Sequence, residues 1–486
     1  MKCVSTSVKF SHAIIAILLS AAAIIFSGCP APAQVVTPTF NPTPGIFKVD
    51  QSVTFNCATP GATIYYTTDG TDPTYYSTMF SSAIPVVGDG TTVNIKAIAA
   101  VLEMRDSELA ESSYSIHYPG ALDEEFLASG NGIDAGTVMT IAMQGDGKIL
   151  IGGTFTSFNG TPRGYIARLN VDGSLDTSFL ATGAGANNYV LSIAVLSTGR
   201  IIIGGSFSAY NEIDVGYIAR LNSDGSLDTT FLSTGGGASG SVWSIALADE
   251  NKLLIGGGFS TYNSVSRGRI ARLNGDGSLD ADFLSSGTGA SGIVYCIAVQ
   301  KSDEKIIIGG EFSSYNGMNR GRLARLNDDG SLDAAFPIAG DGADDAVHVV
   351  AEQSDGKILI GGKFHNFSFD VSRHFTRLLS SGVIDPTFIS VGANGGTENE
   401  VYAIALPGDG TIIIGGAFGS FNGINRGRIA KMSSDGSMDS SFLSSGTGVN
   451  GSLRSVALLN DGKILIGGNF TDYNGIARGS MARLWN

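Results

Sequence analysis

Charged residues are scarce in this chain of 486 residues, since Asp, Glu, Lys and Arg together make up only 15% of it. A disordered chain is rich in charge and poor in apolar residues, so this composition argues against disorder. Lys and Arg number 30 against 44 Asp and Glu, which gives a formal net charge of -14. Nucleic-acid binding requires a basic face that neutralises phosphates, so we expect no nucleic-acid partner.

Cysteine is also rare, with four in the whole chain. Cys3 and Cys29 lie near its start, which leaves Cys57 and Cys296 for the folded part. Two cysteines in separate domains indicate neither a disulfide framework nor a metal site. We therefore expect two buried, unreactive thiols.

Glycine, by contrast, is abundant, with 67 residues in a chain that is 43% hydrophobic. Average proteins contain about 7% glycine. Each glycine costs about 1 kcal/mol in a helix interior, which argues against a helical bundle or a coiled coil. The composition instead predicts an all-β chain of many short strands joined by tight turns.

The first residues have the order of a secretory signal. Lys2 and Lys9 precede an apolar stretch over residues 13–26, and Cys29 follows shortly after. Such a stretch is too short to span a bilayer as a mature helix but suits a signal-peptide core. The residues before Cys29 resemble the lipobox of bacterial lipoproteins, which implies a signal peptide over 1–28 and lipidation of Cys29. An ordinary cleaved signal is the alternative.

A segment rich in Pro and Thr follows over residues 29–45 and predicts a flexible tether. Pro30, rather than Asp, follows the cysteine. In bacterial lipoproteins this implies export to the outer membrane, facing either the periplasm or the outside. We therefore expect a lipid-anchored protein of the bacterial cell envelope, with the membrane as a partner through its lipid.

Residues 39–116 alternate apolar and polar side chains between turn signals, which predicts a small antiparallel β-sandwich. The run from Pro60 to Pro73 resembles the immunoglobulin-like C-terminal domain of chitobiase and β-hexosaminidase. In those enzymes the domain is accessory, so the resemblance implies a spacer or a weak carbohydrate-facing module without catalytic residues. Four tyrosines here either stack on sugar or, as we favour, pack across strands: Tyr65, Tyr66, Tyr75 and Tyr76.

A Gly-Gly pair recurs seven times at intervals of 52 to 54 residues, beginning at positions 152, 204, 256, 309, 361, 415 and 467. A period near 50 residues with four expected strands per unit is typical of a propeller blade. Over residues 121–486 the motifs Asp-Gly-Lys-Ile-Leu-Ile-Gly-Gly-x-Phe and Ile-Ala-Arg-Leu-Asn-x-Asp-Gly-Ser-Leu-Asp resemble the delta-60 repeat family of bacterial β-propellers. The resemblance and the count together predict a seven-bladed β-propeller after the small immunoglobulin-like β-sandwich.

The two ends of the repeat array predict how the ring closes. The motif Leu-Asp-x-x-Phe first occurs at residues 122–126, ahead of any Gly-Gly pair, whereas the last copy stops at Asn486 before its own turn. The N-terminal strand therefore completes the blade that the C-terminus leaves unfinished. We expect Asp123 to meet Arg483 at this seam, and the chain to be a monomer.

Residues present in every repeat most simply build the blade, so a unique site is expected where the repeats differ. A sevenfold aromatic set either forms a candidate ligand rim or, as we favour, packs between blades: Phe158, Tyr210, Tyr262, Tyr315, Phe367, Phe421 and Tyr473. Five arginines nearby either meet an anionic ligand or, as we favour, are solvated loop charges: Arg163, Arg267, Arg320, Arg426 and Arg478.

No metal or cofactor site is predicted. The turn at residues 168–176 resembles the calcium loop of other propellers, but Arg or Lys stands at the first ligand position in every repeat, which favours a structural turn. Three histidines lie in the fifth repeat without short ligand spacing: His348, His365 and His374. That repeat, with residues 364–369 and the upstream acids Asp341, Asp344 and Asp345, is the expected place for a unique surface.

The sequence contains no recognised catalytic motif. We therefore expect a non-catalytic, membrane-anchored interaction or adhesion scaffold that binds a protein or glycan through its propeller. The alternatives are a carbohydrate-binding protein and, ranked last, a propeller glycan hydrolase or lyase.

Overall fold

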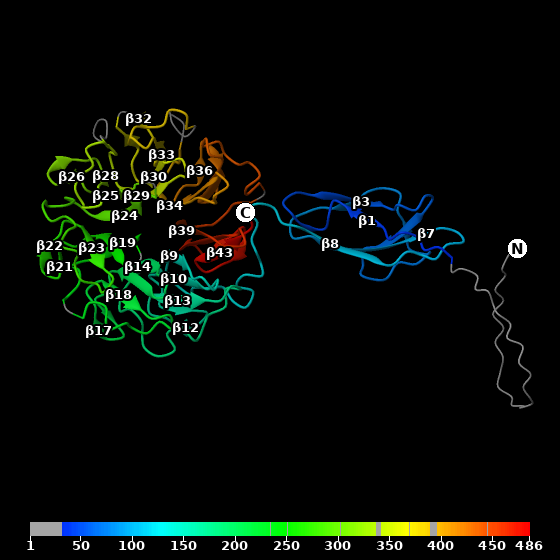
Figure 1. Ribbon diagram of the computed structural model, residues 1–486, viewed down its shortest axis with the longest axis horizontal. Coiled ribbons are helices and arrows are strands. Elements are labelled where there is room, and N and C mark those ends of the chain that lie inside the picture. Colours follow the sequence, from blue (N-terminus) through cyan, green and yellow to red (C-terminus); the bar gives the residue numbers. More distant parts are fainter. Residues whose placement is uncertain are drawn as a thin grey trace, which may run out of the picture. The chain divides into compact units, whose positions relative to one another are not determined.

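The computed structural model describes residues 32–486 except 234, 250, 302, 337–341, 369, 389–395 and 445. The expected signal peptide and Cys29 lie outside the described residues. The chain divides into two compact units, a smaller one that includes Gln51–Val86 and Thr92–Ser115 and a larger one that includes Ile116–Asn486 (Figure 1). Every described element is a strand, so no helix among them is long and apolar enough to cross a membrane.

The smaller unit contains two antiparallel sheets. One has the order β1 (Thr39–Asn41), β3 (Gln51–Asn56) and β6 (Ile84–Val86). The other has the order β2 (Gly45–Phe47), β8 (Ala110–Ile116), β7 (Thr92–Ala100), β4 (Thr63–Thr67) and β5 (Thr78–Met79). Along β7, Ile95, Ala97 and Ala99 are buried at every second position, and Phe40 and Phe55 from the other sheet pack against this core. This alternation is the pattern of a sheet with one buried face.

The larger unit is a ring of seven blades, each a three-stranded antiparallel sheet (Figure 1). The inner strands, nearest the centre, are β9 (Val138–Met143), β14 (Val190–Val195), β19 (Val242–Asp249), β24 (Val294–Val299), β29 (Val347–Glu352), β34 (Val401–Ala405) and β39 (Ser452–Leu458). The middle strands are β10 (Ile149–Gly153), β15 (Ile201–Gly205), β20 (Lys252–Gly257), β25 (Ile306–Gly310), β30 (Ile358–Gly362), β35 (Ile412–Gly416) and β40 (Ile464–Asn469). The third strands are β13 (Ile166–Leu169), β18 (Ile218–Leu221), β23 (Ile270–Asn274), β28 (Leu323–Leu326), β33 (Phe375–Leu378), β38 (Ile429–Met432) and β43 (Met481–Leu484).

A short hairpin follows the middle strand of each blade as a separate two-stranded sheet. The hairpins are β11 (Ser157–Phe158) with β12 (Thr161–Pro162), β16 (Ala209–Tyr210) with β17 (Ile213–Asp214), β21 (Thr261–Tyr262) with β22 (Val265–Ser266), β26 (Ser314–Tyr315) with β27 (Met318–Asn319), β31 (Asn366–Phe367) with β32 (Asp370–Val371), β36 (Ser420–Phe421) with β37 (Ile424–Asn425), and β41 (Asp472–Tyr473) with β42 (Ile476–Ala477).

The middle strands are apolar because they are covered on both faces. All five residues of β10 are buried, as are those of β15, β25, β30 and β35. A strand that is buried on both faces is a continuous apolar run rather than an alternating one. This accounts for the recurring Ile-Ile-Ile and Ile-Leu-Ile segments and for the low share of charged residues.

The fourth strand expected in each blade is reduced to a single pair of residues. In the first blade Leu175 pairs with Leu169, and the N–H of Asp176 donates to the carbonyl of Arg168 at 2.9 Å. The chain then turns away, and the N–H of Leu180 bonds the carbonyl of Asp224 in the next blade. A sheet of three strands with one added bridge is therefore the correct description of a blade.

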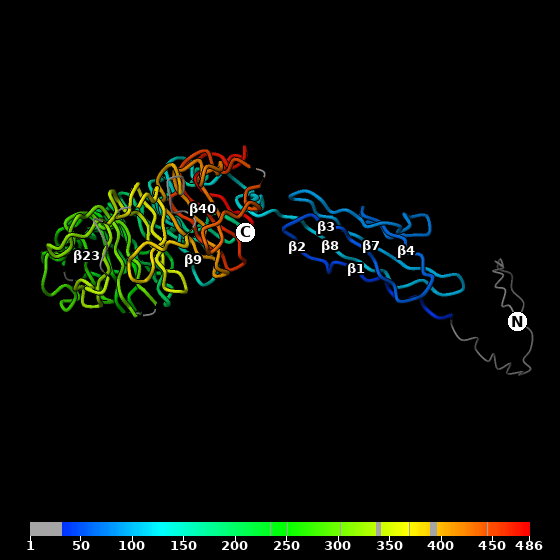
Figure 2. Tube along the Cα trace, turned by 90° about the horizontal axis from the view of Figure 1, so that it is seen from above, coloured from blue at the N-terminus to red at the C-terminus, as the bar shows by residue number. Residues whose placement is uncertain are grey.

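The ring closes between the two ends of the repeat array. Leu122 pairs with Leu484, and the N–H of Asp123 donates to the carbonyl of Arg483 at 2.8 Å. The Arg483 guanidinium Nε lies 2.6 Å from Oδ2 of Asp123. The inner strand β39 contacts β9, and β9 and β40 lie side by side (Figure 2). The seven-bladed propeller expected from the sequence is confirmed.

Candidate functional site

The sevenfold aromatic set lies inside the blades rather than on a rim. All seven side chains, from Phe158 to Tyr473, are at most 1% exposed. The hydroxyls of Tyr210, Tyr262 and Tyr315 each donate to a glycine carbonyl at 2.7 Å, those of Gly225, Gly277 and Gly330. A ring that is buried on both faces cannot stack on a ligand. The candidate ligand rim is therefore wrong. The favoured alternative, packing inside the propeller, is correct for these residues.

The five arginines that follow these aromatics lie on separate blades and do not converge. In each, Nη1 donates to the carbonyl of the preceding residue, for example from Arg163 to Pro162 at 2.8 Å and from Arg267 to Ser266 at 2.9 Å. Burial lowers the pKa of the Arg163 and Arg267 guanidinium groups. These arginines are packed parts of the blades rather than free loop charges.

The calcium-like turn is held together by the protein's own groups. In the first blade Oδ1 of Asp172 accepts hydrogen bonds from the N–H and the hydroxyl of Ser174, at 2.9 and 2.7 Å. Arg168 donates from Nε to Asp176 at 2.8 Å. Within the described part of the chain, no group of three or more His, Cys, Asp or Glu residues is placed to hold a metal ion.

The three histidines of the fifth blade fall into two places. His365 and His374 are neighbours, with ring centroids 4.5 Å apart. Asp344 nearby accepts the backbone N–H groups of His365 and Asn366, at 2.8 and 3.1 Å, and so shapes the loop. His348 lies elsewhere, on the inner strand β29. Asp341 and residue 369 lie outside the described residues.

Each inner strand contains a β-bulge at the same position of the repeat. In the fourth blade Val294 pairs with Gly310 and Cys296 with Gly309, so Tyr295 is the extra residue without a partner. The same shift in register occurs in all seven blades. Bulges re-aim a side chain and are common beside functional sites.

The Gly-Gly pair exists because of this bulge and because of the close packing of blades. A Cβ atom on Gly310 would lie 2.0 Å from the carbonyl oxygen of Ile293, the residue just before the bulged segment. A Cβ atom on Gly309 would lie 2.7 Å from Cγ1 of Val347 in the next blade. Only glycine fits both positions.

The bulged residue is variable, whereas the residue before it is nearly constant. The residue before it is Val in six blades and Leu in the seventh, and it is fully buried throughout. From the first blade to the seventh, the bulged residues themselves are Met139, Leu191, Trp243, Tyr295, His348, Tyr402 and Arg454. A position that holds six residue types in seven blades, directly after one that is nearly constant, is where a site unique to one part of the ring is expected.

Five of these residues, on the third to seventh blades, form a continuous chain of contacts that we call the inner arc: Trp243, Tyr295, His348, Tyr402 and Arg454. The ring centroids of Trp243 and Tyr295 lie 5.2 Å apart, as do those of Tyr295 and His348. His348 and Tyr402 follow at 5.1 Å. The Arg454 guanidinium lies 3.7 Å from the centre of the Tyr402 ring. All five side chains are half-buried, so each keeps some exposed surface.

Carboxylates border the inner arc. The hydroxyl of Tyr295 donates to Glu311 at 2.6 Å, and that of Tyr402 donates to Glu400. Burial, together with the hydrogen bond to Glu400, raises the pKa of Tyr402 to about 12. Glu400 also lies 3.5 Å from Nε2 of His348.

The imidazole of His348 is uncharged at neutral pH. Burial lowers its pKa, and this effect outweighs the opposing one of Glu400. Its Nε2 atom is buried and has no hydrogen-bond partner among the described residues. Lys363 and Asp345 beside it form an exposed ion pair at 3.1 Å. The inner arc thus combines aromatic faces, a neutral imidazole, a guanidinium and two carboxylates.

The sequence led to only part of this site. His348 and Asp345 fall in the fifth repeat, where a unique surface was expected, but Trp243, Tyr295 and Arg454 were not singled out. The available signal was a position of the repeat that holds six residue types in seven copies, directly after a position that is Val or Leu in every copy. The β-bulge that places these side chains in contact is a feature of the backbone. The pattern of apolar and polar residues in the sequence does not reveal it.

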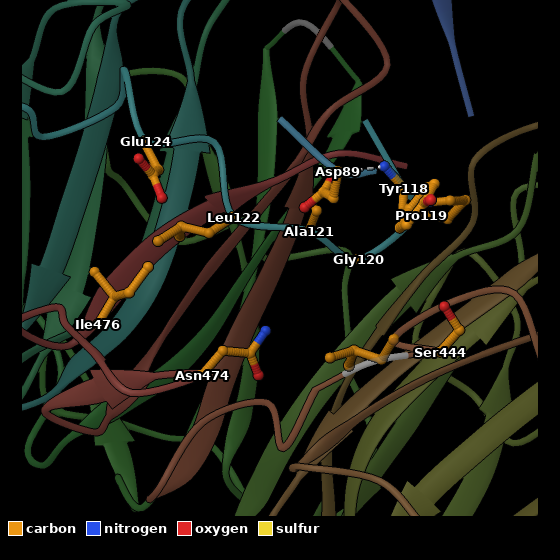
Figure 3. A pocket seen from close by; sticks show the side chains of 11 residues that line it. Asp89, Tyr118, Pro119, Gly120, Ala121, Leu122, Glu124, Ser444, Asn474 and Ile476 are labelled. Atoms are coloured by element: carbon orange, nitrogen blue, oxygen red, sulfur yellow. Dashed lines mark hydrogen bonds between the residues drawn. The ribbon is translucent and has the colours of Figure 1, made fainter. Parts of the chain in front are cut away.

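A separate pocket lies where the ring closes (Figure 3). It is lined by the chain from Tyr118 to Leu122 together with Glu124, Asn474 and Ile476. Asp89 accepts the backbone N–H of Tyr118 at 2.8 Å, and Gly120 accepts the hydroxyl of Tyr473. Because Gly120 and Tyr473 come from opposite ends of the propeller, the pocket is part of the seam.

Two solved structures are similar in fold to this chain, each at 14% sequence identity and each covering 73% of it. One is the extracellular domain of a hybrid two-component system from B. thetaiotaomicron, with a TM-score of 0.44; this chain covers 39% of its length. The other is the WD40 β-propeller domain of Doa1, with a TM-score of 0.43 and 94% of its length covered. No curated protein matches the chain.

Two family descriptions match the chain in sequence. The chitobiase/β-hexosaminidase C-terminal domain matches residues 42–111. The β-propeller domain of unknown function DUF5122 matches seven segments: 144–179, 196–231, 251–283, 301–336, 353–388, 408–442 and 459–486. The chain therefore belongs to the DUF5122 β-propeller family, with seven repeats placed behind a chitobiase/β-hexosaminidase C-terminal domain.

Proposed function

We propose that the propeller is a non-catalytic binding module and that the inner arc is its ligand site. The observation that carries this proposal is the variable bulge: one position per blade holds six residue types around the ring, and five of these side chains lie in contact. Most ligand sites combine aromatic surface with a few polar groups that fix orientation. The inner arc has this composition, whereas the aromatics shared by all blades are buried.

The repeats themselves supply substitutions that test the site without disturbing the fold. Leu191 and Met139 occupy the bulge in the second and first blades. Trp243→Leu and Arg454→Met therefore place a residue that this backbone position already accepts. We expect the double variant to keep its melting temperature but to lose retention on immobilised envelope extract of the source bacterium, by about tenfold or more.

The matched control is Tyr76→Ala, which removes a fully exposed aromatic from the smaller unit. The control is expected to bind like the wild type. If the double variant is retained as strongly as the wild type, the inner arc is not the ligand site. If bound material is released in chemically altered form, the module is an enzyme.

We further propose that the protein is held at the outer membrane by a lipid on Cys29. The support is the signal-like order of the N-terminal residues, with the Pro/Thr-rich segment that follows as a tether. The test is Cys29→Ala with metabolic labelling by a radioactive fatty acid and cell fractionation. We expect the variant to lose its label and to leave the membrane fraction. A variant that stays in the membrane fraction would contradict the anchor.

A further inference from the structure

We infer that the inner arc binds an uncharged oligosaccharide, and this inference rests on the proposed function. The first argument is the aromatic surface. Trp243 and Tyr295 meet edge to face, at an interplanar angle of 83°, so the two rings present faces in different directions. One face of a pyranose ring carries C–H bonds that pack on an aromatic face, and two perpendicular rings offer such faces in two directions.

The second argument is the mixture of hydrogen-bonding groups. Glu311 and Glu400 each accept one tyrosine hydroxyl, and a carboxylate has further acceptor positions. Arg454 supplies donors, and Nε2 of His348 is a buried polar atom without a partner among the described residues. A sugar hydroxyl both donates and accepts, so a polyhydroxylated ligand pairs with the carboxylates and with the guanidinium at once.

Charged groups of both signs border the inner arc. Lys363 and Asp345 neutralise each other in their ion pair, which leaves Glu311 and Glu400 against Arg454. An anionic ligand would approach two carboxylates. A cationic ligand would meet Arg454, which already occupies the face of Tyr402. Because charges of both signs border the arc, we infer a ligand that has no charge of its own.

The inner arc is long enough for several sugar units. The inner arc crosses five consecutive blades, and each member contacts the next at 5.2 Å or less. A single sugar covers one or two such contacts, whereas a chain of sugars follows the arc. The first and second blades end the arc with Met139 and Leu191, which have no polar side-chain group for a sugar hydroxyl. We therefore expect an oligosaccharide rather than a monosaccharide.

The experiment is calorimetric titration of the full chain with three kinds of probe. The neutral probes are cello-, xylo-, malto- and chito-oligosaccharides, the anionic probe is an oligogalacturonate, and the cationic probe is spermidine. We expect saturable binding of at least one neutral oligosaccharide and weaker binding of its monosaccharide. Trp243→Leu is expected to weaken binding about tenfold, Tyr402→Phe to weaken it less, and Tyr76→Ala to leave it unchanged.

Three results would overturn the inference: binding of only the charged probes, binding that Trp243→Leu leaves unchanged, or no binding of any neutral probe. These results are distinct from failure of the proposed function. If envelope retention depends on the inner arc while every neutral probe fails, the arc remains the ligand site and only the glycan assignment is wrong. If retention is also independent of the arc, both fail.

Discussion

At the scale of single residues, glycine permits the β-bulge that frees one side chain of each inner strand from strand pairing. The second glycine of each pair lets the preceding inner strand come close enough to form a bulge, as Gly257 does opposite Ser241, whose carbonyl oxygen would lie 2.1 Å from an added Cβ atom. The bulge then frees one residue per blade, Trp243 in this case, from pairing. The glycine content first visible as composition thus has a specific use at the inner arc.

A pair of neighbouring glycines tests this role. Gly257→Ala forces the backbone apart, whereas Gly258→Ala adds a methyl group with nothing within 4 Å and no positive φ. We expect Gly257→Ala to lower the free energy of unfolding by about 1–3 kcal/mol and Gly258→Ala to change it by less than about 0.5 kcal/mol. Urea unfolding followed by circular dichroism measures both. Equal effects of the two substitutions would contradict the role assigned to the bulge.

At the scale of the element, a blade is a repeated unit in which one altered residue opens or fills space. Five blades carry an arginine before their third strand. In the first, third and sixth blades burial lowers the pKa of this arginine, and a nearby Asp opposes that effect. The second blade has Val215 instead, and a cavity of about 240 Å³ lies beside it, lined also by Arg220, Asp228 and Phe231. The cavity therefore lies beside the position at which five other blades carry the arginine.

Val215→Arg restores the side chain that the other blades carry. We expect the variant to be more stable by about 0.5–2 kcal/mol, because it fills the cavity with a packed arginine stem. Differential scanning calorimetry measures the change. Val171→Arg, at an exposed turn position, is the control and is expected to leave the melting temperature unchanged. If the Val215→Arg variant melts at or below the wild-type temperature, the introduced arginine does not pack into the cavity.

The sequence predicts the number of blades better than it predicts the outermost strand of each blade. The period of 52 to 54 residues predicted seven blades, and the two ends of the repeat array predicted that Asp123 meets Arg483 at the seam. They did not predict that the fourth strand shrinks to a bridge, because the backbone of Leu180 bonds the next blade instead. The sequence favoured packing between blades for Tyr210, which is buried, but not the carbonyl of Gly225 that its hydroxyl reaches, because only the fold brings that carbonyl near.

At the scale of the whole molecule, a belt of buried ion pairs runs through six of the seven blades, and the arginine of each pair also donates to a carbonyl of the next blade. The sixth blade has Lys431 instead, which donates to Asn486. Arg272 donates from Nε to Asp280 at 2.7 Å and from Nη1 to the carbonyl of Asp328 in the next blade at 2.6 Å. Arg483 does the same across the seam, with Asp123 and the carbonyl of Val171. The seam is therefore bonded like the other blade junctions, although it joins the two ends of the repeat array.

This belt predicts acid sensitivity. Burial alone would raise the pKa of Asp280, but hydrogen bonds from Lys252 and Arg272 outweigh it and lower the pKa to about 2, and that of Asp385 is also lowered to about 2. An unfolded Asp has a pKa of about 3.9, so the folded state is favoured above that pH, and the advantage is lost as the pH falls towards 2. We expect the melting temperature to be steady from neutral pH to about 5 and to fall steeply below about 4.

The variant Asp280→Asn separates this effect from general acid denaturation. Breaking one partner of a buried pair costs about 3–5 kcal/mol, so the variant is expected to be much less stable than the wild type at neutral pH. Near pH 2 the wild-type carboxyl is itself being protonated, and the difference is expected to shrink. Urea unfolding at both pH values measures it. A difference of equal size at both would contradict the assignment of the acid sensitivity to these carboxylates.

The central claim is that ligands bind at the inner arc, and the chain contains a direct reporter of it. Trp243 lies in the arc, and the only other tryptophan, Trp485, stacks on His117. In the full chain with Trp485→Phe, all tryptophan fluorescence arises from Trp243. The decisive measurement is this fluorescence during titration with an oligosaccharide or envelope fraction that calorimetry shows to bind. We predict a saturable change in emission with the calorimetric affinity, and binding without any change at Trp243 would contradict the account.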